Sequence, residues 1–175
     1  MNQIIFSLIL LVLFIVEGTT FQVFYADLTD LTYVMIPRYA LTFILYASFY
    51  IGRIRGMWYG IAIGFLQDII YGDIVGIYTF TMGVVAYFSG LTFKIFHPNV
   101  LLIILSLGAS LFFHEGIAYG LFYLFSLTDV GWRWQLSNVW IPTVLLNMGF
   151  GILVHYVTQR WMVTLDGLEE EEKSS

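Results

Sequence analysis

The sequence contains no cysteine, and only 11% of its 175 residues are charged. The missing thiols exclude disulfides, thiolate metal sites and a cysteine nucleophile. Seven lysines and arginines are too few for a nucleic-acid-binding surface. The sequence also lacks an HExxH pair, a nucleophile elbow and a phosphate-cradling glycine loop followed by lysine. We therefore expect a protein that is not an enzyme and that needs no metal or other cofactor.

Long hydrophobic runs are what the sequence does contain. Hydrophobic residues make up 59% of the chain, and runs rather than alternation indicate a polytopic membrane protein. Because each transmembrane helix needs about 20 residues, there is room for about six spans and no soluble domain. The predicted spans are approximately 4–24, 33–51, 57–71, 74–93, 100–127 and 139–158. We predict one all-α bundle of about six transmembrane helices in residues 1–165, followed by an acidic, disordered tail at 166–175.

The basic residues predict how this bundle is oriented. Five of the seven lie on one side of the six-span arrangement, namely Arg53, Arg55, Lys94, Arg160 and Lys173. The positive-inside bias therefore places both termini in the cytoplasm. The N-terminus lacks a basic n-region and a small-residue cleavage site, so we interpret the first span as a retained helix. The short third span leaves one alternative open, a re-entrant hairpin covered by neighbouring protein.

Glycine recurs at every fourth residue around the third predicted span. The register runs through Gly52, Gly56, Gly60, Gly64, Gly72 and Gly76, with Asp68 in the remaining place. A glycine costs about 1 kcal/mol relative to alanine in a helix. In apolar helices the compensation is usually close packing, because a bare face lets another backbone approach. We therefore predict that five glycines pack helices together or bind a partner's helix: Gly56, Gly60, Gly64, Gly72 and Gly76.

A polar layer is predicted inside the bundle, where ionisable residues are costly and are candidates for function. With about 1.5 Å rise per residue, five polar side chains from five helices fall about 18–22 Å above the cytoplasmic interface. These are Glu17, Arg38, Asp68, Glu115 and Asn147. Arg38 is the counter-ion for three carboxylates, because its planar fork can hold two of them, and we expect it to pair with Asp68.

Structural alternatives remain for three of these residues. Arg38, beside Pro37 at a helix start, can extend its charge to the membrane surface. Glu115 can be neutral and hydrogen-bonded to a carbonyl of a neighbouring helix. Asn147 can simply bond across helices, which is worth about 0.6 kcal/mol on average.

Four segments of the chain follow one another in a recognisable order and spacing. They are Glu17 near the end of the first helix, Ile36-Pro37-Arg38, the run Gly60-x3-Gly64-Phe65-x2-Asp68 before Gly76-Ile77-Tyr78, and Ile141-Pro142-Thr143-x-Leu145-Leu146-Asn147. In these segments, and in its length and number of spans, the chain resembles the bacterial rod shape-determining protein family MreD. The Gln67-Asp68 end of the glycine helix is the closest match.

The resemblance implies a non-enzymatic, multi-pass subunit of the cell-elongation machinery in the bacterial cell membrane. Such a protein assembles with the bitopic protein MreC, near MreB filaments, the wall-synthesising glycosyltransferase and its penicillin-binding transpeptidase. It thereby supports peptidoglycan synthesis and maintains cell shape. The resemblance also implies an architecture similar to the S-components of energy-coupling-factor transporters, which are six-helix proteins with a substrate pocket on the outer side.

Two other functions compete with this assembly role. The first is a small-molecule binding or transport subunit of the S-component type, with a pocket near Glu17, Arg38, Asp68 and Glu115. The second, weaker alternative is an intramembrane enzyme that uses Asp68 or Glu115, although no second catalytic group is visible. A pocket requires these side chains to converge on a cavity, whereas a scaffold requires them to be satisfied inside the bundle.

Overall fold

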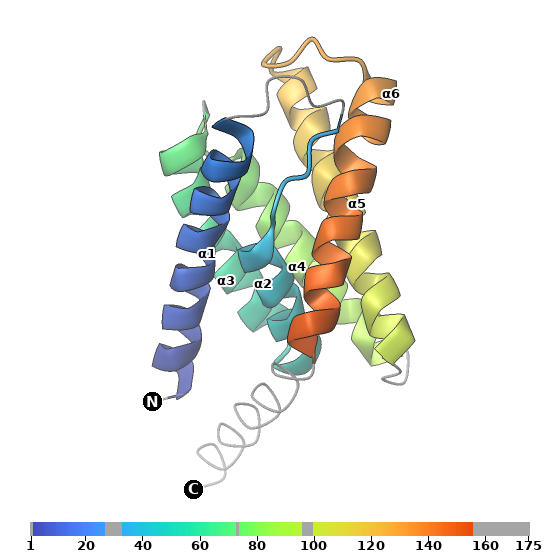
Figure 1. Cartoon of the computed structure of the whole chain (residues 1–175). Helices are drawn as coiled ribbons and strands as arrows, with labels where there is room; N and C mark the ends of the chain where they lie inside the picture. Colours follow the sequence, from blue (N-terminus) through green and yellow to red (C-terminus); the bar gives the residue numbers. More distant parts are fainter. Residues whose placement is uncertain (1, 27–32, 73, 96–99, 156–175) are drawn as a thin grey trace, which may run out of the picture.

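The computed structural model describes residues 2–26, 33–72, 74–95 and 100–155, and over these ranges the chain is an all-helical bundle without β-strands. Its helices are α1 (Asn2–Ala26), α2 (Tyr39–Tyr50), α3 (Arg53–Tyr71), α4 (Ile77–Ile95), α5 (Val100–Leu124) and a last helix. That helix begins as α6 (Trp132–Gln135), continues through the π-helical turn η1 (Leu136–Trp140) and reaches residue 155 (Figure 1). The prediction of an all-α bundle of about six helices is confirmed, and the predicted tail at 166–175 lies outside the described residues.

Three helices of the described part are long and apolar enough to cross a bilayer, namely Gln3–Gln22, Val100–Leu124 and Trp132–His155. Two further apolar helices are shorter, Tyr39–Tyr50 and Ile77–Leu91. These lengths fit a membrane protein, since a helix needs about 20 residues to span the hydrocarbon core.

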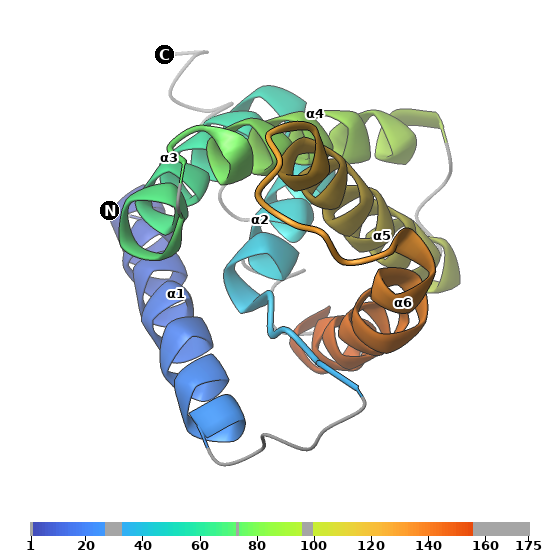
Figure 2. The same ribbon diagram turned by 90° about the horizontal axis from the view of Figure 1, so that it is seen from above.

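The short helix α2 forms the centre of the bundle. Figure 2 shows it surrounded by α1, α3, α4, α5 and the last helix. Every residue from Ala40 to Phe49 is buried, so α2 lacks the solvent- or lipid-facing side that an outer helix has. Phe6 of α1 stacks on Phe43 of α2 with ring centroids 4.8 Å apart, and Leu107 and Leu111 of α5 belong to the same apolar core.

The second predicted span is only partly helical, which corrects its predicted start at residue 33. Residues 33–38 are not helical, and α2 begins at Tyr39. Pro37 explains the delay, because the proline ring disfavours helical geometry at Ile36 and the proline itself has no N–H to donate. Val34 instead donates its N–H to the carbonyl of Asn138, over 2.8 Å.

Two other predicted boundaries also change, and the alternative for the third span is decided. The last helix begins at Trp132 rather than near residue 139, because a polar sequence beyond an apolar run can continue its helical hydrogen bonds. Helix α5 ends at Leu124 rather than 127, and Ser126 then adopts a positive φ of 56°. The third span is one continuous helix from Arg53 to Tyr71, so the re-entrant hairpin is wrong.

The glycines of α3 bring its backbone against that of α4. A Cβ atom on Gly60 would lie 2.7 Å from the carbonyl oxygen of Met82, and one on Gly64 would lie 2.7 Å from Cα of Thr79. Both obstacles are backbone atoms, which cannot rotate away. This face of α3 is therefore covered within the chain itself.

The remaining glycines of the predicted register have different roles. Gly56 faces the side chain of Ser48 in α2. Gly72 ends α3, with its N–H bonded to the carbonyl of Asp68 over 3.0 Å. Gly76 has φ of 124°, a conformation that favours glycine, and it introduces α4. The glycine spacing of four residues thus continues past the end of α3 into the turn before α4.

Candidate functional site: a polar cavity beside Arg38

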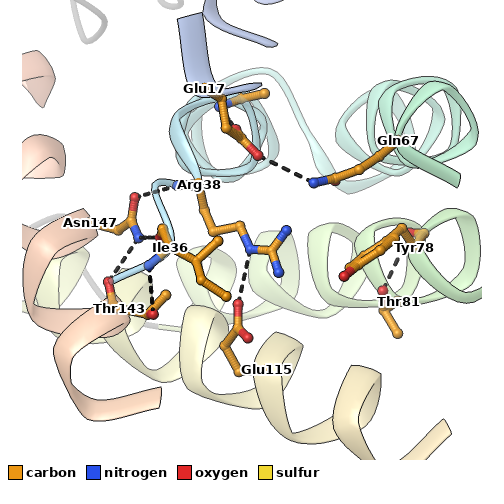
Figure 3. Close-up of polar contacts among 10 residues, drawn as sticks. Glu17, Ile36, Arg38, Gln67, Tyr78, Thr81, Glu115, Thr143 and Asn147 are labelled. Atoms are coloured by element: carbon orange, nitrogen blue, oxygen red, sulfur yellow. Dashed lines mark hydrogen bonds and ion pairs between the residues drawn. The ribbon is translucent and has the colours of Figure 1, made fainter. Parts of the chain in front are cut away.

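Arg38 lies at the end of the extended segment 33–38, directly before α2, and is only 4% exposed. Its Nε donates a hydrogen bond to Oε1 of Glu115 over 3.0 Å, and this contact is also an ion pair (Figure 3). Glu115 comes from the middle of α5 and is itself buried. The guanidinium therefore stays inside the protein and does not extend to the membrane surface.

Two side chains of the last helix bind the backbone of the extended segment. Thr143 Oγ1 accepts the N–H of Ile36 over 3.0 Å, and Asn147 Nδ2 donates to the carbonyl of Ile36 over 2.9 Å. Asn147 Oδ1 accepts the N–H of Arg38 over 2.7 Å. Since no water is present in a bilayer core, non-helical backbone there needs such partners. Asn147 thus binds across helices, but its target is backbone.

Glu17 of α1 binds both the start of α2 and the end of α3. Its Oε2 accepts the N–H of Ala40 over 3.1 Å, and its Oε1 accepts the Nε2 of Gln67 over 3.3 Å. Ala40 lies in the first turn of α2, where backbone N–H groups have no partner within the helix. The side chain of Glu17 provides that partner from a neighbouring helix.

Asp68 does not join this group, and the predicted pair between Arg38 and Asp68 is wrong. The carboxylate of Asp68 accepts the backbone N–H groups of Gly76, Tyr78 and Thr79 over 2.8–2.9 Å, and the hydroxyl of Thr79 over 2.6 Å. It therefore caps α4 from the end of α3. Consecutive residues of a helix point about 100° apart, so Gln67, not Asp68, faces Glu17.

A cavity of about 190 Å³ lies beside these groups. It is lined by Glu17, Gly18, Phe21, Ile36, Pro37, Arg38, Gln67, Tyr71 and Tyr78. The guanidinium carbon of Arg38 lies 5.2 Å from the centre of the Tyr78 ring, a cation–π contact. Gln67 hydrogen-bonds Glu17 in this lining but is not among the five predicted polar residues; the sequence pointed to it only through the Gln67-Asp68 end of the glycine helix.

Four of the five predicted polar residues therefore come together: Glu17, Arg38, Glu115 and Asn147. Glu115 pairs with the guanidinium, Glu17 lines the same cavity as Arg38, and Asn147 fixes the backbone of Arg38. Within the described residues, no group of three His, Cys, Asp or Glu side chains is placed to hold a metal ion.

A second, larger hollow of about 570 Å³ lies between α4 and α5. Its lining includes Ser89, Ser106, Ala109 and Ser110 among apolar side chains. The hydroxyls of Ser89 and Ser110 are hydrogen-bonded to each other over 2.6 Å. We call this surface the α4–α5 groove.

The comparisons with known proteins agree with the resemblance found in the sequence. A family model of the rod shape-determining protein MreD matches residues 1–165. The rod shape-determining protein MreD of Bacillus subtilis (strain 168) is 25% identical over 155 residues, which cover 88% of this chain and 90% of that protein. No solved structure matches the chain, so the expected similarity to S-components stays a prediction.

Proposed function

Because this chain belongs to the MreD family of rod shape-determining membrane proteins, we propose that it is a non-enzymatic subunit of the bacterial cell-elongation machinery. In this role it assembles with MreC and, through it, with peptidoglycan synthesis proteins and MreB. The observation that carries the proposal is the family match, which covers the whole helical bundle.

The surface proposed for the transmembrane helix of MreC is the α4–α5 groove. The glycine face of α3 is not available, because α4 covers it. The groove has small residues at Ser106, Ala109 and Ser110, and small residues let a helix backbone approach closely in a membrane. Phe88 and Phe113 line it and are 60% and 64% exposed, so they offer apolar contact area.

The test is co-purification with MreC in mild detergent. Ala109→Leu places a larger side chain in the groove, and we expect it to reduce the recovered MreC at least fivefold without lowering thermal stability. The matched control is Ala62→Leu, which makes the same change at an exposed alanine outside the groove, on α3. Equal recovery of MreC with both variants would exclude the groove, and no recovery with the unchanged protein would contradict the assembly role.

We further propose that the chain crosses the membrane six times with both termini in the cytoplasm. The 12 residues of α2 span about 18 Å. The extended segment before α2 adds up to about 20 Å, so together they suffice for a core about 30 Å thick. Reporter fusions at Gly131 should report the outside and fusions at Gly52 the cytoplasm. A cytoplasmic signal at Gly131 would overturn this topology.

A second candidate function is the binding of a small molecule. The polar cavity favours it, since Arg38, Glu17 and Gln67 line one space. Asp68 is not part of this site, because its carboxylate is occupied by α4.

A further inference from the structure

We propose that the cavity beside Arg38 binds a small zwitterion that carries a primary ammonium and an acidic oxygen group. Free phosphoethanolamine and the headgroup of phosphatidylethanolamine both have this chemistry. The inference goes beyond the assembly role, because it depends on the lining of the cavity and not on the groove between α4 and α5.

One wall of the cavity carries hydrogen-bond acceptors, so a ligand at this wall needs a hydrogen-bond donor. Gln67 is only 6% exposed, and its Oε1 has no hydrogen-bond partner in the described part of the chain. Its Nε2 is already used by Glu17. Each carboxylate oxygen of Glu17 accepts one hydrogen bond there, and a carboxylate has about four acceptor sites. An ammonium group carries three donors and the matching charge, so it suits this wall.

Another wall of the cavity carries hydrogen-bond donors, so a ligand there needs an acidic oxygen group. Arg38 donates its backbone N–H to Asn147 and its Nε to Glu115, and its side chain also contacts Tyr78 through a hydrogen bond and a cation–π contact. Figure 3 shows the two terminal amino groups of the guanidinium extending toward Tyr78, away from the oxygen that Nε binds. Arginine presents a planar fork that matches phosphate and carboxylate groups. This part of the cavity therefore suits an anionic group.

The charge of the surroundings favours a ligand with both signs. Glu17 and Glu115 together carry one more negative charge than Arg38 balances when both are ionised. A simple anion adds to that excess, and a simple cation is repelled by the guanidinium charge of Arg38. The headgroup of phosphatidylethanolamine changes no net charge, because its phosphodiester and its ammonium carry one charge each. Free phosphoethanolamine has a monoester phosphate with a charge of about −1.5 to −2 at pH 7, so it is slightly negative overall. Both place each end against a group of opposite sign.

The size of the cavity limits the ligand. A cavity of about 150 Å³ accommodates benzene, with six non-hydrogen atoms, so 190 Å³ accommodates about eight. Phosphoethanolamine has about this number. A trimethylammonium group is bulkier and has no N–H to donate to Gln67, so phosphocholine should be excluded.

Tyr71 forms the entrance to the cavity. It lines the cavity and yet is 47% exposed. A Cβ atom at Gly18 would collide with the Tyr71 hydroxyl. The absence of a side chain at Gly18 therefore leaves room for Tyr71 at this entrance.

The experiment uses the full chain in nanodiscs of phosphatidylcholine and phosphatidylglycerol. One arm titrates O-phosphoethanolamine by calorimetry, and the other replaces phosphatidylcholine with phosphatidylethanolamine and detects retained lipid by native mass spectrometry. We expect binding in at least one arm. We also expect it to be at least tenfold weaker in Gln67→Met, which removes the unpartnered oxygen and keeps the contact between Arg38 and Glu115.

The outcomes separate the two sources and can overturn the proposal. Binding in the first arm identifies a soluble ligand, and binding only in the second identifies a lipid headgroup. The control Gly120→Ala, whose Cβ would meet nothing within 4 Å, should bind like the unchanged protein. Equal binding of inorganic phosphate or phosphocholine, unaltered binding by Gln67→Met, or no binding in either arm by folded protein would each refute the proposal.

Discussion

The junction between α3 and α4 and the cavity beside it differ in how completely their polar groups are bonded. At the junction, Asp68 accepts four hydrogen bonds, and Gly60 and Gly64 leave no space between the two backbones. One residue earlier in the chain, Gln67 faces a cavity and keeps an unpartnered oxygen. The same turn of α3 therefore has one side that is closed and structural and another that is open to a ligand.

Polarity by itself does not distinguish these two sides. A buried carboxylate whose hydrogen bonds are provided by backbone N–H groups stabilises the fold and has little capacity left for a ligand. Buried polar groups that line a space and lack partners carry a cost, which a bound molecule can offset. The comparison predicts that substitutions at the junction reduce stability, whereas substitutions at the cavity wall mainly reduce binding.

The largest effect is expected from Gly64→Leu. The new side chain would collide with the backbone of Tyr78 and Thr79, which cannot move without separating α4 from α3. Overpacking a core usually costs about 1–3 kcal/mol, and a backbone obstacle should exceed that range. We expect little folded protein by size-exclusion chromatography. Gly120→Leu is the control at an open position, and equal folded yields would contradict the close-packing argument.

The next largest effect is expected from separating Arg38 and Glu115. Removing one member of a buried ion pair typically costs about 3–5 kcal/mol, whereas replacing both with apolar residues is often nearly neutral. The single variant Arg38→Leu should therefore have a lower free energy of unfolding than the double variant Arg38→Leu/Glu115→Leu. Unfolding of both variants in detergent measures this difference. In the corresponding double-mutant cycle of Arg38→Leu and Asp68→Leu, the two losses of stability should add, because Asp68 bonds to α4 instead. Coupling to Asp68 rather than to Glu115 would overturn the assignment of the two sides.

A moderate effect is expected from Asp68→Asn. Asparagine keeps one oxygen but loses the charge and the second acceptor, so fewer of the hydrogen bonds to Gly76, Tyr78 and Thr79 remain. Losing a helix cap costs about 0.5–2 kcal/mol. Thermal unfolding should show this loss, while binding of phosphoethanolamine should be unchanged. A weaker ligand affinity would mean that the junction and the cavity are one site.

The smallest loss of stability is expected from Gly18→Leu. The three atoms nearest its Cβ would all belong to the side chain of Tyr71, which is partly exposed and can rotate. We expect the free energy of unfolding to fall by less than about 1 kcal/mol, which is below the usual range for overpacking. The cavity entrance should be obstructed nevertheless, so ligand binding should decrease. Gly120→Leu again serves as the matched control.

Composition and spacing were sufficient to predict the helical bundle and four members of the polar group. Heights along helices locate residues along the membrane normal, which is why Glu17, Arg38, Glu115 and Asn147 were selected together. Heights contain no information about direction around a helix, so Asp68 was paired with Arg38 and Gln67 was not selected. The angular difference of about 100° between consecutive residues decides which of them faces the cavity.

The extended segment before α2 was also missed, although its cause is visible in the sequence. Pro37 opposes helical geometry at the preceding residue, but a span predicted from hydrophobicity alone does not take this effect into account. The partners of the segment, Thr143 and Asn147, lie more than 100 positions away. Local patterns do not reveal contacts over such a separation.

This separation has a consequence for biosynthesis. The backbone groups of Ile36 and Arg38 receive their partners from a helix that is translated 107–111 residues later. At about 5–20 residues per second, the ribosome needs about 5–20 s to produce that helix. During this interval the extended segment 33–38 lacks these partners and cannot reach its final hydrogen-bonded form. Maturation of the described bundle therefore requires its last helix, which begins at Trp132, and ribosome-released fragments that lack this helix should be substrates for membrane proteases.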